Sequence, residues 1–257
     1  MIIKELRKQM TDLKTLSISL VSGKGGVGKT NMSLNLGYAL HKAGYSSMLM
    51  DCDVGLANLD VLLGLAPEKT IQDLLSSDSD TSDVVVPIEE GGFDFIPSAS
   101  GVSEMLELEN EEQSFIFDKL DAMLRNYDFF IMDLGAGISR TVLSFAAMSQ
   151  ERIIVITSEP TSLTDGYALI KVLSMEYGVK NFHVTANMVR DEQEGQRSFD
   201  RLAAAAERFL DIKLNYLGAV RSDPAVPQAV IKQVPLLKLS PKCNASSDLL
   251  RLAVKLK

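Results

Sequence analysis

The chain has few cysteines and histidines, which limits the chemistry that it can perform. Its 257 residues include two cysteines, Cys52 and Cys243, and two histidines. Two cysteines are too few for a disulfide framework, and neither stands at metal-ligand spacing from a histidine. We therefore predict that both thiols are reduced and packed.

Long apolar runs and clusters of basic residues are also missing. No apolar run approaches the roughly 18 to 20 residues that span a bilayer, and the opening stretch, MIIKELRKQM, lacks the apolar middle of a signal peptide. A cytoplasmic location is therefore expected. The net charge is −8, and phosphate backbones are bound mainly by lysine and arginine, so nucleic acid is not an expected partner.

Short apolar runs rich in β-branched residues alternate with stretches of helical length. The predicted strands are 16–22, 46–51, 93–98, 128–134, 152–158, 181–187 and 214–220. The predicted helices are 29–43, 111–126, 140–148, 165–177, 196–210 and 224–232, and the acidic stretch 76–83 is a predicted surface loop. Most strands are apolar on both faces. This pattern predicts an α/β fold of three layers, a doubly wound and mostly parallel sheet with helices on both faces and ligands at the carboxyl ends of its strands.

The stretch SGKGGVGKT, residues 22–30, matches the phosphate-binding P-loop, because Gly23 is followed after four residues by Gly28, Lys29 and Thr30. A predicted strand precedes it and a predicted helix follows it. In such a loop the backbone N–H groups point at phosphate, the lysine neutralises the β- and γ-phosphates, and the threonine hydroxyl meets Mg²⁺. The predicted nucleotide contacts are Gly25, Gly26, Val27, Gly28, Lys29, Thr30 and Asn31.

A second lysine, Lys24, stands early in the same loop. It would lie on the open side of the phosphates, and the alternative is a solvated lysine on a mobile loop. The spacing KGGVGKT resembles the deviant Walker A motif of the MinD/ParA family of dimerising ATPases. The resemblance implies Mg²⁺-dependent hydrolysis of ATP to ADP, a homodimer that forms with ATP, and a catalytic Lys24 that reaches the nucleotide of the partner subunit.

Acidic residues end two of the predicted strands. Asp51 and Asp53 lie two residues apart, so they share one side of an extended chain. In the resembled family the residue at Asp53 supports hydrolysis and the residue at Asp51 is nearer the metal; capping of the following turn is the alternative for both. Asn58 is a weaker candidate for orienting water or for packing across a dimer.

Asp133 follows four hydrophobic residues in DFFIMDLGAG, which is the Walker B arrangement for holding Mg²⁺ through water. Gly135 and Gly137 leave room for a backbone contact with a γ-phosphate. Alone this pattern is common, but together with the P-loop it predicts that Thr30, Asp51 and Asp133 surround the metal.

MinD and ParA proteins usually have proline in the segment that reads DLGAGIS here. This departure, with DVGLANLDVLLGL and SEPTSLTDGYALIK, resembles the FlhG (FleN/YlxH) branch, whose MinD-like ATPases regulate bacterial flagellar number and placement. Its implied partners are an FlhF-type GTPase, flagellar switch-complex proteins or a flagellar transcription regulator. The alternative is a ParA-like, DNA-associated partition ATPase, or an ATPase that positions chromosomes, plasmids or the division site.

The resemblance runs from about residue 15 to the end, so we predict one P-loop ATPase domain over 15–257 and a candidate partner-binding segment over 1–14. Related ATPases hold adenine at the places of Asn187 and Asp223; a satisfied strand-end amide and a helix N-cap are the alternatives. The final stretch is amphipathic. Core packing is the favoured role for it, and peripheral contact with the inner face of the membrane is the alternative.

Overall fold

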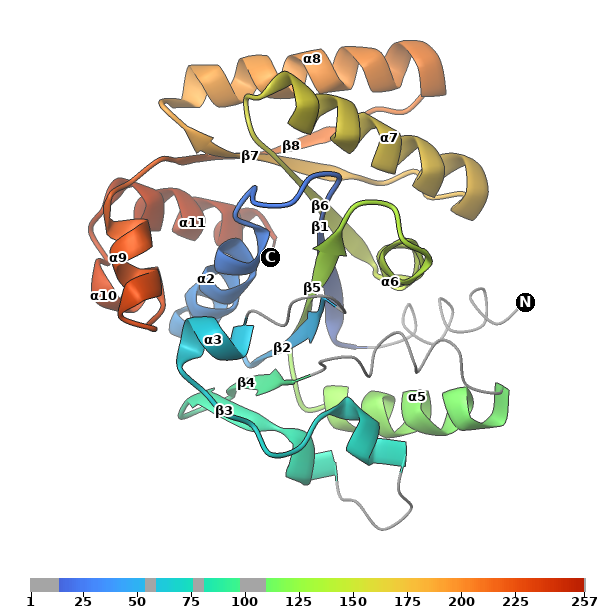
Figure 1. Cartoon of the computed structure of the whole chain (residues 1–257), viewed down its shortest axis with the longest axis vertical. Coiled ribbons are helices and arrows are strands. Elements are labelled where there is room, and N and C mark those ends of the chain that lie inside the picture. The colour runs from blue at the N-terminus through green and yellow to red at the C-terminus, as the bar shows by residue number, and fades with distance from the viewer. Residues whose placement is uncertain (1–13, 54–58, 76–80, 98–109, 257) are drawn as a thin grey trace.

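The computed structural model describes residues 14–53, 59–75, 81–97 and 110–256. Its centre is an eight-stranded sheet in the order β3-β4-β2-β5-β1-β6-β7-β8, drawn in Figure 1. Of the described strands, β3 alone runs antiparallel to its neighbour. The strands are β1 (Leu16–Ser22), β2 (Ser47–Cys52), β3 (Val86–Glu89), β4 (Phe93–Ile96), β5 (Phe129–Ala136), β6 (Glu151–Ile156), β7 (His183–Val189) and β8 (Asn215–Arg221).

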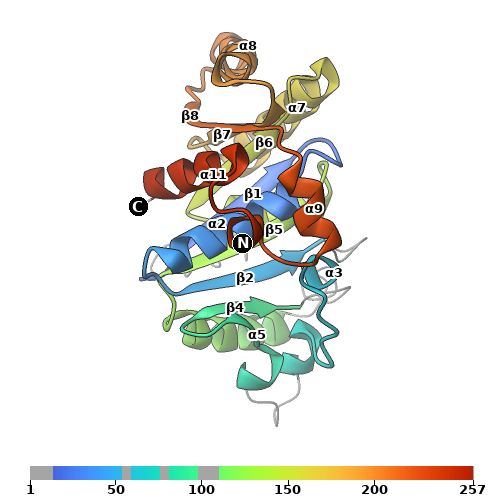
Figure 2. The same cartoon turned by 90° about the vertical axis from the view of Figure 1, so that its left-hand side faces the viewer.

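Helices cover both faces of this sheet. One face carries α2 (Lys29–Lys42), α9 (Ala225–Ile231), α10 (Leu236–Leu239) and α11 (Asn244–Lys255); Figure 2 looks onto it. The other face carries α5 (Asn110–Leu124), α6 (Arg140–Met148), α7 (Pro160–Tyr177) and α8 (Glu192–Leu210). The short helix α3 (Leu59–Leu63) and two 3₁₀ turns, Ile71–Leu75 and Thr81–Val84, complete the described elements. The predicted three-layer α/β fold is confirmed.

Side chains on the two faces of each central strand pack into two separate hydrophobic cores. On β5, Phe130 and Met132 pack under α5 to α8, whereas Phe129 and Ile131 pack under α2 and α11. This arrangement explains why the strand sequences are apolar throughout instead of alternating, since a parallel sheet between two helical layers has no solvated face.

Most of the predicted elements lie within two residues of their predicted bounds, and the larger differences have local causes. Helix α7 was expected to begin at Asp165 but begins at Pro160, which occupies the first turn, where its missing N–H costs nothing. Helix α8 was expected from Gln196 but begins at Glu192, because Asp191 accepts a hydrogen bond from the Glu194 N–H at 2.8 Å.

The final amphipathic stretch packs as core, as favoured from the sequence. Leu249, Leu252 and Leu256 of α11 are buried in the same cluster as α2. No described helix is long and apolar enough to cross a membrane. The predicted segment 1–14 lies outside the described residues except for Lys14, so the division at residue 15 stays a prediction.

Candidate functional site

The sheet order brings the predicted site residues to one edge. Strands β2, β5 and β1 are neighbours, and in their register Asp51 pairs with Asp133, which pairs in turn with Leu20 near the end of β1. Figure 1 shows these three strands side by side. Their register therefore places both carboxylates near the carboxyl ends of strands that neighbour β1, which leads into the loop.

The loop between β1 and α2 needs its glycines. Gly26 and Gly28 have φ values of 77° and 83°, a region that side chains other than glycine rarely adopt. Close approach adds a second constraint, because a Cβ on Gly23 would lie 2.2 Å from the Asp165 backbone carbon in α7. A Cβ on Gly28 would lie 2.4 Å from Asn187 Nδ2. The loop is thus shaped by α7 on one side and by β7 on the other.

Lys29 is buried at the start of α2, and its Nζ lies 3.0 Å from Asp133 Oδ1. The same carboxylate oxygen accepts a hydrogen bond from Ser33 Oγ at 2.9 Å. Sequence reasoning missed Ser33, although a position one helical turn after the loop lysine places its side chain on the same side of α2. The three residues form a compact polar group under the loop.

The other oxygen, Asp133 Oδ2, is buried and has no hydrogen-bond partner among the described residues. An orphaned carboxylate oxygen of this kind is costly unless a ligand satisfies it. It suits Mg²⁺, which keeps most of its water and takes one or two protein ligands. Among the described residues, no group of three or more His, Cys, Asp or Glu side chains is arranged so that it could hold a metal ion by itself. Thr30, the next predicted metal residue, is half-buried in the first turn of α2.

The Asp51 carboxylate holds the two ends of the segment that follows β2. Its Oδ1 accepts from the Asp53 N–H at 3.0 Å, and its Oδ2 accepts from the Leu59 N–H at 3.1 Å. This geometry matches the capping alternative for Asp51. Asp53 lies beside the end of β5, since a Cβ on Gly135 would be 3.3 Å from Asp53 Oδ1. Asn58 falls outside the described residues.

Cys52 follows Asp51 as the last residue of β2 and is buried. Burial, reinforced by Asp51 and Asp133, raises the pKa of its thiol well above the usual range. The side chain is therefore a packed neutral thiol, as the sequence predicts.

Lys24 contacts α7 of its own chain. Its Nζ forms an ion pair with Glu159 and a hydrogen bond of 3.2 Å with Thr161 Oγ1. The Lys24 and Glu159 side chains are 37% and 61% exposed, and an exposed pair of this kind is worth about 0 to 1 kcal/mol. The contact holds Lys24 only weakly.

A cavity of about 510 Å³ opens beside the loop, between α2, β7 and α9. Asn187 lies in its wall, and its Nδ2 donates to the Val27 carbonyl at 2.7 Å. A carbonyl can only accept, so this bond determines which end of the amide is the donor. The amide oxygen of Asn187 is then the end that can accept from a ligand.

Asp223 also lines this cavity, and its carboxylate caps two helices. Oδ1 accepts from the Ala225 N–H at 2.9 Å, and Oδ2 accepts from the Asn244 N–H at 3.0 Å. These bonds hold the pKa of the Asp223 carboxyl below its usual range, and the bond from the Ala225 N–H has the largest effect. The arrangement matches the capping alternative and positions the loop at the cavity mouth.

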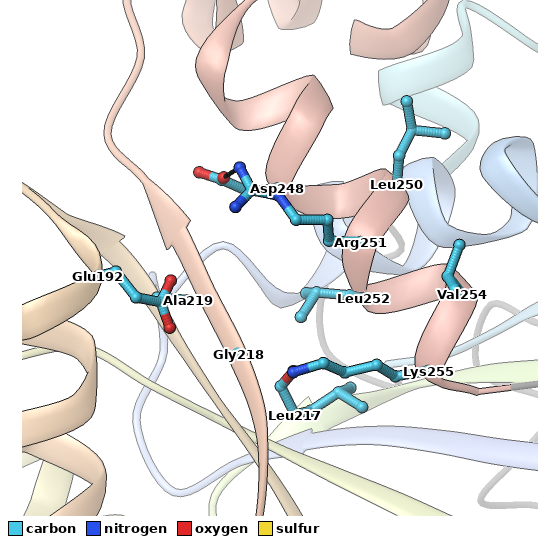
Figure 3. A pocket seen from close by; sticks show the side chains of 10 residues that line it. All are labelled: Glu192, Leu217, Gly218, Ala219, Asp248, Leu250, Arg251, Leu252, Val254 and Lys255. Atoms are coloured by element: carbon cyan, nitrogen blue, oxygen red, sulfur yellow. Dashed lines mark hydrogen bonds and ion pairs between the residues drawn. The ribbon is translucent and has the colours of Figure 1, made fainter.

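A second cavity, of about 420 Å³, lies where α11 and α8 flank β8 (Figure 3). Its charged lining residues are Asp248, Arg251 and Lys255 of α11 and Glu192 of α8. None of the residues predicted for the nucleotide site lines it, so it is separate from the loop and its acidic neighbours.

Comparison with known proteins agrees with this geometry. A family model described as an AAA domain matches residues 15–185. The antiactivator FleN of Pseudomonas aeruginosa is 40% identical over 240 residues, which cover 93% of this chain and 85% of FleN. The flagellum site-determining protein YlxH of Helicobacter pylori is 35% identical over 228 residues, which cover 88% of this chain and 76% of YlxH.

Among solved structures, a chain of the MinC:MinD cell division protein complex of Aquifex aeolicus matches with a TM-score of 0.73 at 26% identity. The match covers 94% of this chain and 96% of that one. The flagellar relatives share most of their length with this chain, and the MinD structure shares its fold. The chain therefore belongs to the MinD/ParA family of P-loop ATPases, in the branch that contains FleN and YlxH.

Proposed function

We propose that this chain is an ATP-dependent dimeric switch that regulates bacterial flagellar number and placement. ATP joins two subunits, and hydrolysis to ADP and phosphate releases them. The surface of the dimer is what binds the partner protein. The observation that carries the proposal is the pair of lysines in one loop. Lys29 is buried beneath the phosphate site, whereas Lys24 is part-exposed at its mouth on a weak contact.

Phosphate binding uses the loop backbone and Lys29. In the structure Lys29 neutralises Asp133; an incoming phosphate offers a stronger anionic partner, and the N-terminus of α2 adds its partial positive charge. Thr30 and Asp133 would hold the Mg²⁺ ion, which neutralises charge on the β- and γ-phosphates when bound. The orphaned Oδ2 of Asp133 supports this role.

Base selectivity follows from the orientation of Asn187. Its Nδ2 donates to the Val27 carbonyl, so its oxygen faces the ligand as an acceptor. The exocyclic N6 amine of adenine is a donor, whereas guanine carries the O6 acceptor at that position. The site therefore favours ATP over GTP. Asp223 supports the cavity by positioning α9 and α11.

Hydrolysis requires water to attack the γ-phosphorus while the bond to the β-phosphate oxygen breaks, giving ADP and phosphate. Asp53, which lies against the Gly135 backbone, orients the attacking water. Lys24 leaves Glu159 and neutralises developing charge on the nucleotide of the facing subunit. Cations supplied in trans in this way accelerate phosphoryl transfer by about 10³- to 10⁵-fold in the strongest cases.

The output is recruitment of a flagellar partner. FleN is named an antiactivator, which points to a flagellar transcription activator as the partner of this chain. An FlhF-type GTPase and switch-complex proteins are the other candidates. The flagellar relatives favour this role over the partition-type alternative.

The test is the mass of the protein in solution without nucleotide, with ADP and with ATP. Sedimentation should show a monomer in the first two states and a dimer with ATP and Mg²⁺. Lys24→Ala should remain monomeric with ATP and lose hydrolysis, while its ADP affinity stays within about twofold. Lys213→Ala, which removes the same charge from an exposed site, should dimerise as the natural chain does.

Dimerisation of Lys24→Ala with ATP would overturn the proposed mechanism. So would a natural chain that stays monomeric with a non-hydrolysable ATP analogue. An ATP-dependent and salt-sensitive shift of DNA would instead support the partition-type alternative.

A further inference from the structure

A chain of two asparagine amides links the nucleotide cavity to α10. Asn31 is half-buried and lines the cavity. Asn35, one helical turn further along α2, is fully buried. Its Oδ1 accepts from the Leu237 N–H in the first turn of α10 at 3.2 Å. Its Nδ2 donates to the Asn31 backbone carbonyl at 2.7 Å and to Asn31 Oδ1 at 3.2 Å.

The direction of each hydrogen bond in this chain is determined. A backbone N–H can only donate, so the Asn35 atom that faces Leu237 must be the amide oxygen. The Asn35 NH₂ group therefore faces Asn31, where the backbone carbonyl can only accept. The Asn31 side-chain atom that receives the second hydrogen of this NH₂ must then also be an acceptor, its Oδ1.

This leaves the NH₂ group of Asn31 for the cavity. Within the part of the chain that the structure describes, no protein acceptor for Asn31 Nδ2 is recorded. A reversed Asn31 amide would set two NH₂ groups against each other and leave the buried Asn35 with a donor unsatisfied. The buried Asn35 therefore controls which end of Asn31 the ligand meets.

We propose that Asn35 is a positioning residue for nucleotide binding, which acts through Asn31 by holding the Asn31 NH₂ group toward the cavity. This inference rests on the proposed function, since the ligand is the nucleotide. The group presented is a hydrogen-bond donor, so it binds an acceptor, either an oxygen of the phosphate or sugar or a ring nitrogen of the base. Asn187 supplies a hydrogen-bond acceptor and Asn31 a hydrogen-bond donor, so the cavity can bind both donors and acceptors of the nucleotide.

The test is a double-mutant cycle on ADP affinity, measured by titration calorimetry; ADP avoids both hydrolysis and dimerisation. Asn31→Ala should weaken ADP binding by roughly three- to tenfold, the size of one hydrogen bond. Asn35→Ser keeps a hydroxyl that can reach the Asn31 carbonyl but loses the contact with Asn31 Oδ1. It should weaken binding by a similar factor in the natural background and by less than about twofold in the Asn31→Ala background.

Leu237→Val is the matched control for loosening of α10, because it trims a buried side chain and keeps the N–H that Asn35 accepts from. Its ADP affinity should stay within about twofold. Losses that multiply in the Asn31→Ala, Asn35→Ser double variant would overturn the inference, because Asn35 would then act independently of Asn31.

Asn31→Asp gives a second test that leaves the buried residue untouched. One carboxylate oxygen can still accept from Asn35, while the other replaces the donor that faces the ligand. Binding weaker than that of Asn31→Ala is expected, and binding equal to that of the natural chain would overturn the inference. Absence of ADP binding by the natural chain in the same titrations would overturn the proposed function itself, so the two failures are distinguishable.

Discussion

Gly28 shows most directly how a single residue shapes the nucleotide site. Its φ of 83° lies in the left-handed region, and a Cβ there would lie 2.4 Å from Asn187 Nδ2. We expect Gly28→Ala to displace Asn187 and to tilt the start of α2. ATP and ADP affinity should fall by more than tenfold, because both the phosphate loop and Asn187, the proposed base contact, move. Fluorescent-nucleotide titration would measure the loss.

Gly44 provides the matched control for this substitution. Its φ is 90°, but a Cβ there would meet no atom within 4 Å. Gly44→Ala should therefore lower the free energy of unfolding by roughly 1 to 2 kcal/mol through backbone strain alone. Nucleotide affinity should be unchanged. If both variants bound nucleotide equally well, close packing of the loop against Asn187 would not be what Gly28 provides.

Glu151 gives a pH-dependent contribution to stability far from the site. Its Oε2 lies 2.9 Å from His183 Nε2 and accepts from Asn181 Nδ2 at 2.8 Å. The contact with His183, first among these, holds the pKa of the carboxyl below its usual range. Since the carboxyl binds a proton more readily in the unfolded chain, its contribution is full above the unfolded pKa and is lost as the pH falls through the folded pKa.

Glu151→Gln should consequently lower the free energy of unfolding at pH 7 by less than about 1 kcal/mol, because its contacts are part-exposed. The difference between variant and natural chain should shrink as the pH falls below the ordinary glutamate range. Urea unfolding at a series of pH values would measure it. A difference that persisted unchanged into strong acid would contradict the role of the ionised carboxylate.

Among the elements, α11 protects the edge of the sheet. Strand β8 is an end strand, and two of its backbone groups are satisfied by side chains of α11. Lys255 Nζ donates to the Leu217 carbonyl at 2.7 Å, and the Arg221 N–H donates to Asp248 Oδ2 at 3.1 Å. Figure 3 shows these side chains along the strand. Backbone groups satisfied in this way are less able to pair with another chain.

Asp248 should be the residue on which this arrangement depends. It is buried, and it accepts from the Arg221 backbone and guanidinium and from Arg251. Asp248→Ala leaves several charged donors without their acceptor, so we expect a loss of about 2 to 3 kcal/mol in the free energy of unfolding. Arg251→Ala, at a side chain that is 65% exposed, should cost less than about 1 kcal/mol. Equal losses in chemical unfolding would show that burial of Asp248 is not what makes it important.

The sequence predicts elements well where periodicity and local chemistry agree. The β1 strand, the P-loop and α2 follow one another as expected, because one buried strand, a glycine loop and a helix start all leave local signals. Strand β3 was missed, because Val86 to Glu89 is short, contains a proline, and is a strand only through its pairing with β4. The early start of α8 was signalled by Asp191 and Glu194, a capping pair spaced three residues apart.

The residues of the candidate site likewise divide into those that local patterns predict and those that depend on distant contacts. Spacing predicts Lys29 and Thr30 directly, because the phosphate loop is a local pattern, and it predicts Asp133 once the strand-end carboxylate is taken together with that loop. Ser33 and Asn35 are not predictable in that manner, since their roles depend on Asp133 and Leu237, which are 100 and 202 residues away. The choice between metal contact and loop capping for Asp51 likewise depends on hydrogen bonds that only the folded chain defines.

At the scale of the whole molecule, the nucleotide cavity joins segments from both halves of the chain. The loop and α2 come early in the sequence, whereas Asn187, Asp223 and α9 come late. A ligand that contacts all of them binds only the folded state. It therefore stabilises the entire domain by mass action and not one element alone.

Because of this coupling, nucleotide binding and dimerisation should change the thermal stability of the domain in different ways. At a hundred times its dissociation constant a ligand adds about 2.7 kcal/mol to the free energy of unfolding, which for a chain of this size corresponds to a rise in Tm of roughly 5 to 10 °C. ADP should give such a shift independently of protein concentration.

ATP on the Asp53→Ala variant, in which hydrolysis is suppressed, should give a larger shift that increases with protein concentration, because the dimer is favoured by mass action. Lys24→Ala in that background should reduce the ATP shift to the size and concentration independence of the ADP shift, since its nucleotide site is intact and its dimer contact is not. Differential scanning calorimetry over a hundredfold range of protein concentration would measure these differences. An ATP shift that stayed constant over that range would contradict a dimer held together by the nucleotide.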